Sequence, residues 1–231
     1  MNKKKIAVLS GAGVSQESGI KTFRDADGLW EGHDVQAVAS PQGWINDQEL
    51  VLDFYNQRRK QLKEVKPNGA HLLIAQLEKN YDVVVITQNV DNLHERAGNR
   101  RIIHLHGELT KVRSVDNEEL ISECTGDIVT GDIAEDGSQL RPHIVWFGEQ
   151  VPMLEPAAAE VSTADIVIII GTSMQVYPAA GLVAYAPPFA KIYYIDPKPH
   201  ISYELQNMTN LAIIEKKAVA GMEELVALLD N

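Results

Sequence analysis

The sequence contains short apolar runs bounded by turn residues, and helical patterns lie between many of them. Runs of this kind are typical of strands that are buried on both faces of a parallel sheet. Because strands that alternate with helices form such sheets, we expect an α/β fold with a doubly wound parallel sheet. The apolar runs cover 6–10, 83–87, 102–105, 144–147, 166–170, 191–195 and 211–215, and the helical patterns cover 50–65, 70–79, 155–163 and 221–231.

Two stretches, 19–49 and 111–141, interrupt this alternation and hold little periodicity. A long irregular stretch in a compact domain is usually functional or forms a small module. We expect the first to form a ligand-covering loop and helical cap, and the second a small inserted lobe. The chain is then one domain over 1–231, with a large lobe from approximately 1–20, 68–110 and 142–231 and a small lobe from approximately 21–67 and 111–141.

Composition excludes several classes of protein. Cys124 is the single cysteine, so the chain can form neither an internal disulfide nor a cysteine-based zinc site, which fits a reducing, cytoplasmic setting. A formal net charge of −11 argues against unspecific binding to nucleic acid. The first apolar run is too short for a secretion signal, and no run approaches the ~18 residues that cross a bilayer. We expect a cytoplasmic monomer that binds neither nucleic acid nor membrane.

The first apolar run leads into the glycine-rich segment GAGVSQESG. In a Rossmann-like fold this turn binds a dinucleotide: Gly11 and Gly13 let the backbone approach the pyrophosphate, and helix amides face it. Gln16 replaces the third glycine of the dehydrogenase fingerprint, and FRDADGLWEG stands where a second strand with an acidic end is expected. The turn favours a nucleotide site over an ordinary dehydrogenase, with a plain strand-to-helix turn as the alternative.

Four separated segments, taken together, resemble the sirtuin family. GAGVSQESGIKTFR resembles its GAGxSxxSGIPxFR signature, TQNVDNLHERAG its TQNxDxLHxxAG motif, HLHGEL its HGxx motif and GTSMQVYP its GTSxxVxP motif. Their order and spacing match the family, and the resemblance covers nearly the whole chain. FRDADGLWEG and RPHIVWFGE add agreement with the compact bacterial deacylases.

The resemblance implies an NAD-dependent protein-lysine deacylase that acts on acylated-lysine proteins. Such enzymes split NAD and produce nicotinamide, O-acyl-ADP-ribose and free lysine. The expected activities are deacetylation together with desuccinylation and demalonylation. Three alternatives stay open: a mono-ADP-ribosyltransferase, an inactive NAD- or ADP-ribose-binding module, and a hydride-transferring dehydrogenase.

His106 is the candidate catalytic base. An imidazole with an ordinary pKa of ~6.5 can take a proton near neutral pH. His104 lies two residues away at the end of the same apolar run, so the pattern alone leaves both eligible, and a purely structural histidine is the alternative for either. The resemblance to the HGxx motif selects His106. Gly107 beside it is expected to leave room for a ribose.

Gln88, Asn89 and Asp91 follow the run at 83–87, where the carboxyl end of a parallel strand would gather ligands. The resemblance places Asn89 and Asp91 near the nicotinamide pocket, as catalytic residues with His106. A polar turn that caps a helix is the alternative. The resemblance also implies NAD contacts at Gly11, Ala12, Gly13, Phe23, Arg24, Gln88, Gly171, Thr172, Ser173, Asp196 and Ala218; at Asp196 the family commonly has asparagine.

Tyr55 and Arg58 share a helix face and match the Tyr-x-x-Arg pair of sirtuins that remove succinyl and malonyl groups. A guanidinium holds a carboxylate through two hydrogen bonds, and a phenol adds a third. A surface arginine in a basic stretch is the alternative. Ala26 is expected to widen the acyl pocket. The substrate peptide is expected to pair as a strand with an extended segment at 145–149, through Val145, Phe147 and Gly148, and with 174–176 on its other side.

The chain departs from the family in the inserted lobe. Most sirtuins hold a structural zinc there with two Cys-x-x-Cys pairs, whereas here Cys124 stands alone and Ser114 occupies a common cysteine position. One thiolate cannot build a Cys₄ site. We therefore expect a lobe without metal, held by its own packing.

Overall fold

The structure is a computed structural model that describes residues 3–21 and 29–229. Three of the expected site residues, Phe23, Arg24 and Ala26, lie outside the described residues. No helix in the described ranges is long and apolar enough to cross a membrane.

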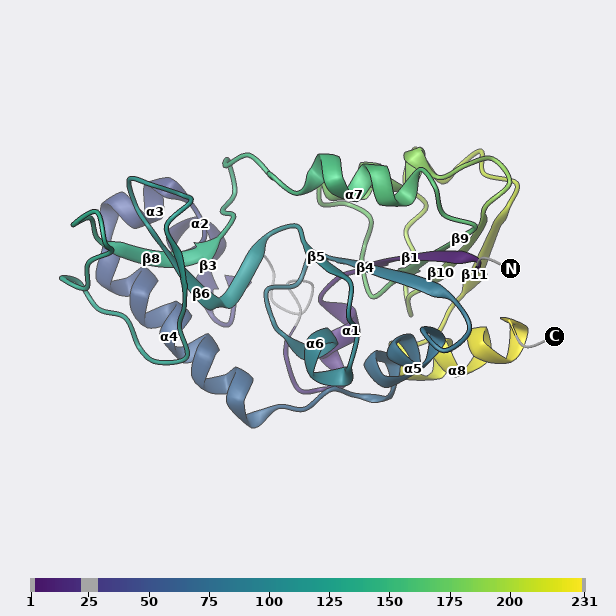
Figure 1. The fold of residues 1–231 in the computed structure, drawn as a ribbon, viewed down its shortest axis with the longest axis horizontal. Helices are drawn as coiled ribbons and strands as arrows, with labels where there is room; N and C mark the ends of the chain where they lie inside the picture. Colours follow the sequence, from purple (N-terminus) through teal and green to yellow (C-terminus); the bar gives the residue numbers. More distant parts are fainter. Residues whose placement is uncertain (1–2, 22–28, 230–231) are drawn as a thin grey trace.

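A six-stranded parallel sheet forms the large part of the molecule (Figure 1). The chain starts in the middle of the sheet, adds two strands on one side, then returns to add three on the other. This strand order is that of a Rossmann fold, in which ligands bind where the order reverses, here between β1 and β9. From one edge to the other the strands are β11 (Leu211–Ile214), β10 (Lys191–Ile195), β9 (Ile166–Ile170), β1 (Lys5–Ser10), β4 (Asp82–Thr87) and β5 (Ile102–His104).

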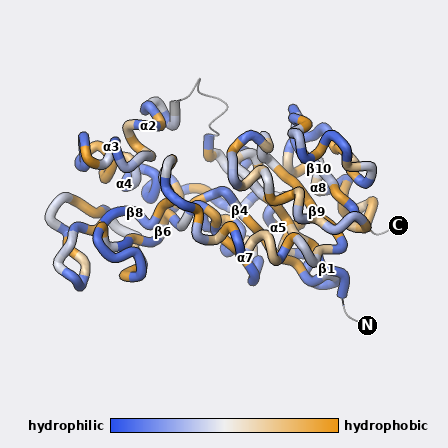
Figure 2. The backbone as a smooth tube through the Cα atoms, turned by 90° about the horizontal axis from the view of Figure 1, so that it is seen from above, coloured by the Kyte–Doolittle hydropathy of each residue, from blue (hydrophilic) through white to orange (hydrophobic). Residues whose placement is uncertain are grey.

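Helices cover both faces of this sheet, because its central strands are apolar on both faces. Ala7 and Leu9 of β1 pack in the core cluster on one face, and Ile6 and Val8 pack in the cluster on the other. In Figure 2 hydrophobic stretches accordingly lie within the part of the molecule that holds the sheet. The first face is covered by α7 (Leu154–Val161) and the 3₁₀ helix η2 (Ala179–Tyr185), and the second by α5 (Gly69–Leu77) and α8 (Ala218–Leu229).

The second, smaller part lies at the other end of the molecule in Figure 1. It combines helices with a three-stranded antiparallel sheet and a short hairpin. Val51 and Phe54 pack with Leu109 and Trp146 in its buried core. Its elements are the hairpin strands β2 (Leu29–Trp30) and β3 (His33–Asp34), the helices α2 (Val35–Val38), α3 (Pro41–Asn46) and α4 (Gln48–Glu64), and the strands β6 (Gly107–Ser114), β7 (Ile121–Glu123) and β8 (Leu140–Ile144).

Two very short helices, α1 (Gly13–Gln16) and α6 (Leu93–Ala97), lie between the two parts. The α/β class and the doubly wound sheet are confirmed, whereas the residue bounds of the two lobes stay a prediction. The segment 111–141 forms most of the antiparallel sheet. Within the described chain it is held by packing of Leu52, Val112 and Ile128 and by a hydrogen bond of 2.6 Å from Ser114 to Asp136.

The expected parallel strand at 144–147 is wrong. Ile144 ends the antiparallel strand β8, and the next residues cross between the two parts of the molecule. The Val145 amide donates to the His106 carbonyl at 2.9 Å, and the Phe147 amide donates to the Ala39 carbonyl at 2.9 Å. The run is apolar because Ile144 and Trp146 fill the core of the small part, and not because it belongs to the main sheet.

Candidate active site

A cavity of about 670 Å³ lies between the carboxyl ends of the main strands and the small part. Strands β1, β4, β9 and β10 end at it, and helix α4 and the segment after β8 close the other side. Every expected site residue in the described ranges lines this cavity: Gly11, Ala12, Gly13, Tyr55, Arg58, Gln88, Asn89, Asp91, His106, Val145, Phe147, Gly148, Gly171, Thr172, Ser173, Asp196 and Ala218.

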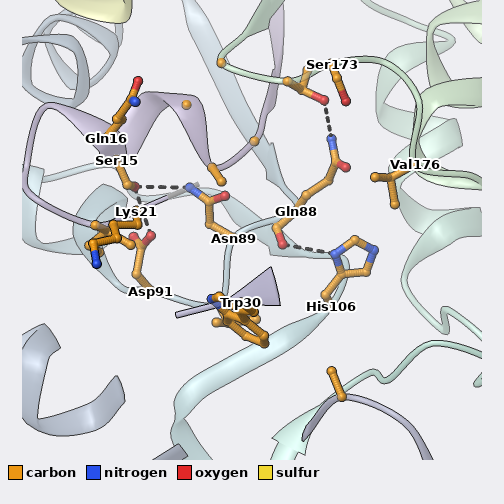
Figure 3. A pocket seen from close by; sticks show the side chains of 18 of the residues that line it. Ser15, Gln16, Lys21, Trp30, Gln88, Asn89, Asp91, His106, Ser173 and Val176 are labelled. Atoms are coloured by element: carbon orange, nitrogen blue, oxygen red, sulfur yellow. Dashed lines mark hydrogen bonds between the residues drawn. The ribbon is translucent and has the colours of Figure 1, made fainter. Parts of the chain in front are cut away.

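The surroundings of His106 fix its tautomer (Figure 3). Its Nδ1 lies 3.0 Å from the Gln88 carbonyl oxygen, which can only accept a hydrogen bond. Nδ1 therefore carries the hydrogen, and Nε2 keeps its lone pair. Burial lowers the pKa of His106, although the bond to Gln88 opposes this shift. The imidazole is consequently neutral at pH 7 and can accept a proton at Nε2.

His104, which the sequence left equally eligible, has a different environment. It is not among the residues that line the cavity, and its Nε2 pairs with Glu95 at 2.6 Å. Burial lowers the pKa of His104, but the hydrogen bond and charge of Glu95 outweigh burial and hold it above its ordinary value. Its Nδ1 contacts the Asn89 carbonyl at 3.3 Å. His104 therefore supports the loop that carries Asn89.

His104 also belongs to the one group of side chains in the described chain with the spacing of metal ligands. One ligand atom each of Glu95, His104 and Glu108 lies within 4.8 Å of the others. Glu95 already pairs with His104, and Glu108 pairs with Lys111 at 2.6 Å. The charges of this group are balanced by these two pairs, and we assign no metal to it.

Ser15 joins Asn89 and Asp91 into a buried chain of hydrogen bonds (Figure 3). The Asn89 amide donates to the Ser15 hydroxyl at 3.1 Å, and that hydroxyl donates to Asp91 at 2.9 Å. Burial raises the pKa of Asp91, and its bonds to Leu93 and Ser15 act in the opposite direction. The motifs did not predict Ser15 as a site residue, although it lies inside the glycine-rich signature, because its partners come from a distant segment of the sequence.

The glycines of the first turn are required by packing as well as by any ligand. The Gly11 amide donates to the Ile170 carbonyl at 3.1 Å and the Gly13 amide donates to the Gly171 carbonyl at 2.7 Å. A Cβ on Gly13 would lie 2.7 Å from the Gly171 Cα. The turn thus presses against the end of β9, and the Gly13 amide is not free for a phosphate. The expected helix behind it, α1, has only four residues.

Gln88 and Thr172 connect the ends of β4 and β9. The Gln88 side-chain amide donates to the Thr172 hydroxyl at 3.1 Å, while its backbone carbonyl holds His106. The Tyr194 hydroxyl donates to the Thr172 carbonyl at 2.9 Å. These bonds fix the edge of the cavity between His106 and the Gly171–Ser173 turn.

Tyr55 and Arg58 approach the cavity from helix α4. The Tyr55 hydroxyl accepts a hydrogen bond of 3.0 Å from the Trp146 indole, and burial raises its pKa, so the phenol stays protonated. Its own hydrogen is left to donate to a ligand. The neighbouring basic side chains differ from Arg58 in their contacts. Arg59 is buried against the Gly126 carbonyl, and Lys60 pairs with Asp127. Arg58 alone of the three faces the cavity.

The segment after β8 is not the extended strand that the sequence predicts. Gly148 has a φ of +93°, and the Glu149 amide donates back to the Trp146 carbonyl at 3.0 Å, which closes a turn. Arg141 and Glu149 brace this turn through a 2.7 Å ion pair. Apolar side chains of Phe147, Val176 and Tyr177 remain exposed where they line the cavity.

Comparison with known proteins gives this arrangement a family. The model of the Sir2 family matches residues 11–178. A Helicobacter pylori protein named NAD-dependent protein deacylase is 58% identical over 96% of both chains, and a Bacteroides thetaiotaomicron protein of the same name is 55% identical over 98% of both.

Solved structures agree with this similarity. A mutant of a Sir2 homologue in complex with ADP-ribose superposes with a TM-score of 0.86 at 38% identity, covering 99% of this chain and 92% of that one. A Sir2 homologue in complex with NAD superposes with a TM-score of 0.84 at 39% identity, covering 99% and 90%. On the sequence motifs, the strand order and these similarities, the chain belongs to the Sir2 family.

Proposed function

We propose that this chain is an NAD-dependent protein-lysine deacylase that transfers acyl groups from lysine to ADP-ribose. The observation that carries the proposal is the neutral His106, whose tautomer is fixed by the Gln88 carbonyl and whose Nε2 is left as a base on the cavity. The names of the relatives that are 58% and 55% identical to the chain support the same activity.

The cavity suits NAD in size and in lining. Its volume lies within the range of ~300–1,000 Å³ that is usual for small-molecule sites. It lies at the switch point of the sheet, where dinucleotides bind in Rossmann folds. Polar groups from several strand ends converge there, namely Thr172, Ser173, Asp196, Asn89 and Asp91. Asp196 would accept hydrogen bonds from ribose hydroxyls. The backbone would approach NAD closely at Gly11, Ala12, Gly13, Gly171 and Ala218.

The residues of the chain would each take a distinct part in the reaction. NAD would supply the sugar carbon that accepts the acyl oxygen as nicotinamide leaves. Asn89 and Asp91, held by Ser15, would orient the nicotinamide end. His106 Nε2 would take a proton from a sugar hydroxyl, and its Nδ1 hydrogen would stay on the Gln88 carbonyl. Positioned acid–base catalysis of this kind contributes typically ~10²–10⁴-fold to a rate.

Acylated lysine would enter beside the exposed Phe147 and Val176, whose apolar surfaces suit the aliphatic lysine stem. Because the segment after β8 turns at Gly148, the peptide would pair with a short stretch near Val145 rather than with a five-residue strand. Arg58 and the Tyr55 hydroxyl would receive an acidic acyl group such as succinyl or malonyl. We also propose a cytoplasmic location. Its only support is the single cysteine, which fits a reducing compartment.

The test is nicotinamide release on mixing NAD with matched acetyl-, malonyl- and succinyl-lysine peptides. Wild type should release nicotinamide with each peptide, and His106→Gln should lose at least about 100-fold in kcat/KM. His104→Gln is the matched control and should lose far less. An intact peptide that gains ADP-ribose would instead establish a mono-ADP-ribosyltransferase. Absorbance of reduced nicotinamide would indicate a dehydrogenase, and binding of NAD without turnover would indicate an inactive module.

A further inference from the structure

The cavity already contains a carboxylate at the place where an acidic acyl group would bind. Glu31 lines the cavity, and its Oε1 lies 3.2 Å from Nη1 of Arg58. Both side chains are largely buried, with 11% and 15% exposure respectively. The other Glu31 oxygen lies 3.3 Å from Nζ of Lys21. Glu31 thus stands between two cations that both line the cavity.

The contact with Arg58 is an ion pair without an aligned hydrogen bond. Nε and Nη1 of Arg58 and Oε1 of Glu31 are buried, and none of them has a hydrogen-bond partner among the described residues. A guanidinium forms its strongest contact with a carboxylate through two parallel hydrogen bonds. Glu31 therefore balances the charge of the guanidinium, while Nε and Nη1 make no hydrogen bond to a described residue.

A strained turn places Glu31 there. In the β2–β3 hairpin Trp30 pairs with His33, so Glu31 and Gly32 form a two-residue turn. Both have positive φ, at 50° and 88°. Asn, Asp or Gly is usual at the first position of such a turn, and a glutamate there is strained. Trp30 stacks edge-on against Phe54 and Tyr55 and so holds the hairpin against α4.

We propose that Glu31 is a specificity-determining residue, an internal carboxylate that competes with acidic acyl groups for Arg58. The inference rests on the proposed deacylase function and deepens it. With a neutral acyl group such as acetyl, Glu31 keeps the buried Arg58 paired, and the enzyme avoids the cost of a lone buried cation. An acidic acyl group gains its hydrogen bonds only as it displaces Glu31 or shares the guanidinium with it. Glu31 thereby limits how strongly the pocket prefers acidic acyl groups over neutral ones.

Removing the charge of Glu31 should therefore shift the preference toward acids. For Glu31→Gln and Glu31→Asn we expect the succinyl-to-acetyl ratio of kcat/KM to rise about tenfold, because the substrate carboxylate no longer competes with a second carboxylate for Arg58. Asparagine tolerates positive φ and keeps the turn folded. Glu224→Gln is the matched control, since it removes one charge from an exposed ion pair between helix α8 and Lys216.

A succinamoyl-lysine peptide, which replaces the terminal carboxylate with a carboxamide of equal size, separates charge from shape. Its ratio to acetyl should not rise in either Glu31 variant. In an Arg58→Met background the Glu31 substitutions should no longer change the succinyl ratio. An unchanged ratio in both Glu31 variants, an equal rise for succinamoyl, or a rise that persists without Arg58 would overturn the inference.

Binding without turnover distinguishes this inference from the proposed function. Fluorescence anisotropy of labelled succinyl- and acetyl-lysine peptides, measured with NAD absent, reports on the pocket alone. Glu31→Gln should tighten succinyl binding relative to acetyl by the same factor, and an unchanged relative affinity would overturn the inference. If wild type releases no nicotinamide with any peptide while this binding shift is found, the deacylase proposal fails and the role of Glu31 stands.

Discussion

Two histidines at the same strand end illustrate how neighbouring residues receive different chemistry. His104 and His106 are separated by one residue, yet one pairs with a carboxylate and the other with a carbonyl. The carboxylate of Glu95 favours the charged imidazole, whereas the carbonyl of Gln88 fixes a hydrogen at Nδ1 without adding a formal charge. The sequence carries both residues, but it does not contain the information about which partner each one meets.

The pH dependence of activity should report this difference. Burial lowers the pKa of His106, so its base form persists below pH ~6.5, the ordinary histidine value. We expect kcat/KM to be level near pH 7 and to fall only in more acidic solution, with a midpoint below ~6.5. Rates of nicotinamide release between pH 5 and 8 test this. A midpoint above that value would identify a base with a raised pKa, as His104 has.

Arg58 gives a second prediction at the scale of one residue. Arg58→Met keeps an unbranched apolar stem but removes the charge and the hydrogen-bond donors, so we expect kcat/KM for succinyl-lysine to fall about 100-fold. Deacetylation should change by less than about threefold, because an acetyl group has no carboxylate to hold. Lys60→Met, close by on the same helix and paired outward with Asp127, is the control. Equal losses on both substrates would remove Arg58 from acyl recognition.

Among the elements, those of the main sheet are the most predictable. The runs at 166–170 and 191–195 coincide with β9 and β10, because a strand that is buried on both faces is apolar at most positions and ends at polar or glycine residues. The run at 144–147 misleads for the same reason: it is apolar on account of a helix–sheet core in the small part. A single sequence does not distinguish these two sources of burial.

Sequence motifs predict most residues of the candidate site and miss others. All described residues of the expected site line one cavity, because the carboxyl ends of parallel strands meet at one edge. Ser15 and Glu31 were missed, since their roles arise from contacts with Asp91 and Arg58, which lie far from them in the sequence. Tertiary pairs of this kind leave no local pattern.

Gly107 links strand β6 to the neighbouring β8. The structure gives a backbone reason for glycine at this position: its φ is +80°, and a Cβ there would lie 2.0 Å from the His143 carbonyl oxygen. That Gly107 also leaves room for a ribose stays a prediction. We expect Gly107→Ala to lower the free energy of unfolding by at least about 2 kcal/mol. Gly126→Ala is the control, because its Cβ would meet no atom within 4 Å.

Urea unfolding of the two glycine variants measures this difference. Gly126→Ala should stay within about 0.5 kcal/mol of wild type. If both variants unfold at the same urea concentration, the close approach of β6 to β8 is not what requires glycine at position 107.

At the scale of the whole molecule, a buried pair of histidines should limit stability in acid. The rings of His71 and His94 lie 4.8 Å apart, both fully or almost fully buried, and His94 also contacts the Ser10 hydroxyl at 3.0 Å. Burial lowers the pKa of His71 to about 4, and burial together with the charge of His71 lowers that of His94 well below its ordinary value. Both rings are neutral in the folded protein at pH 7.

Because the unfolded chain protonates these histidines near pH ~6.5 and the folded chain does not, stability is complete above that pH and is lost as the pH falls toward 4. The shift of His71 alone corresponds to about 2 kcal/mol lost between pH 7.5 and pH 5. Urea unfolding at both pH values should show this loss in wild type and a smaller one in His71→Gln. The same loss in both proteins would mean that other groups set the acid limit.

The pairing of β1 with β9 has a consequence for how the chain is made. Ile6 pairs with Ile166, so the central strand gains this partner only after most of the chain has been synthesised. Closing so long a loop is slow, and until then the first glycine turn has no β9 to pack against. A nascent chain that has not yet reached Ile170 exposes one edge of β1 to solvent, to chaperones and to other chains. Production of this enzyme should therefore be most vulnerable to aggregation during translation, before the last strands of the sheet have left the ribosome.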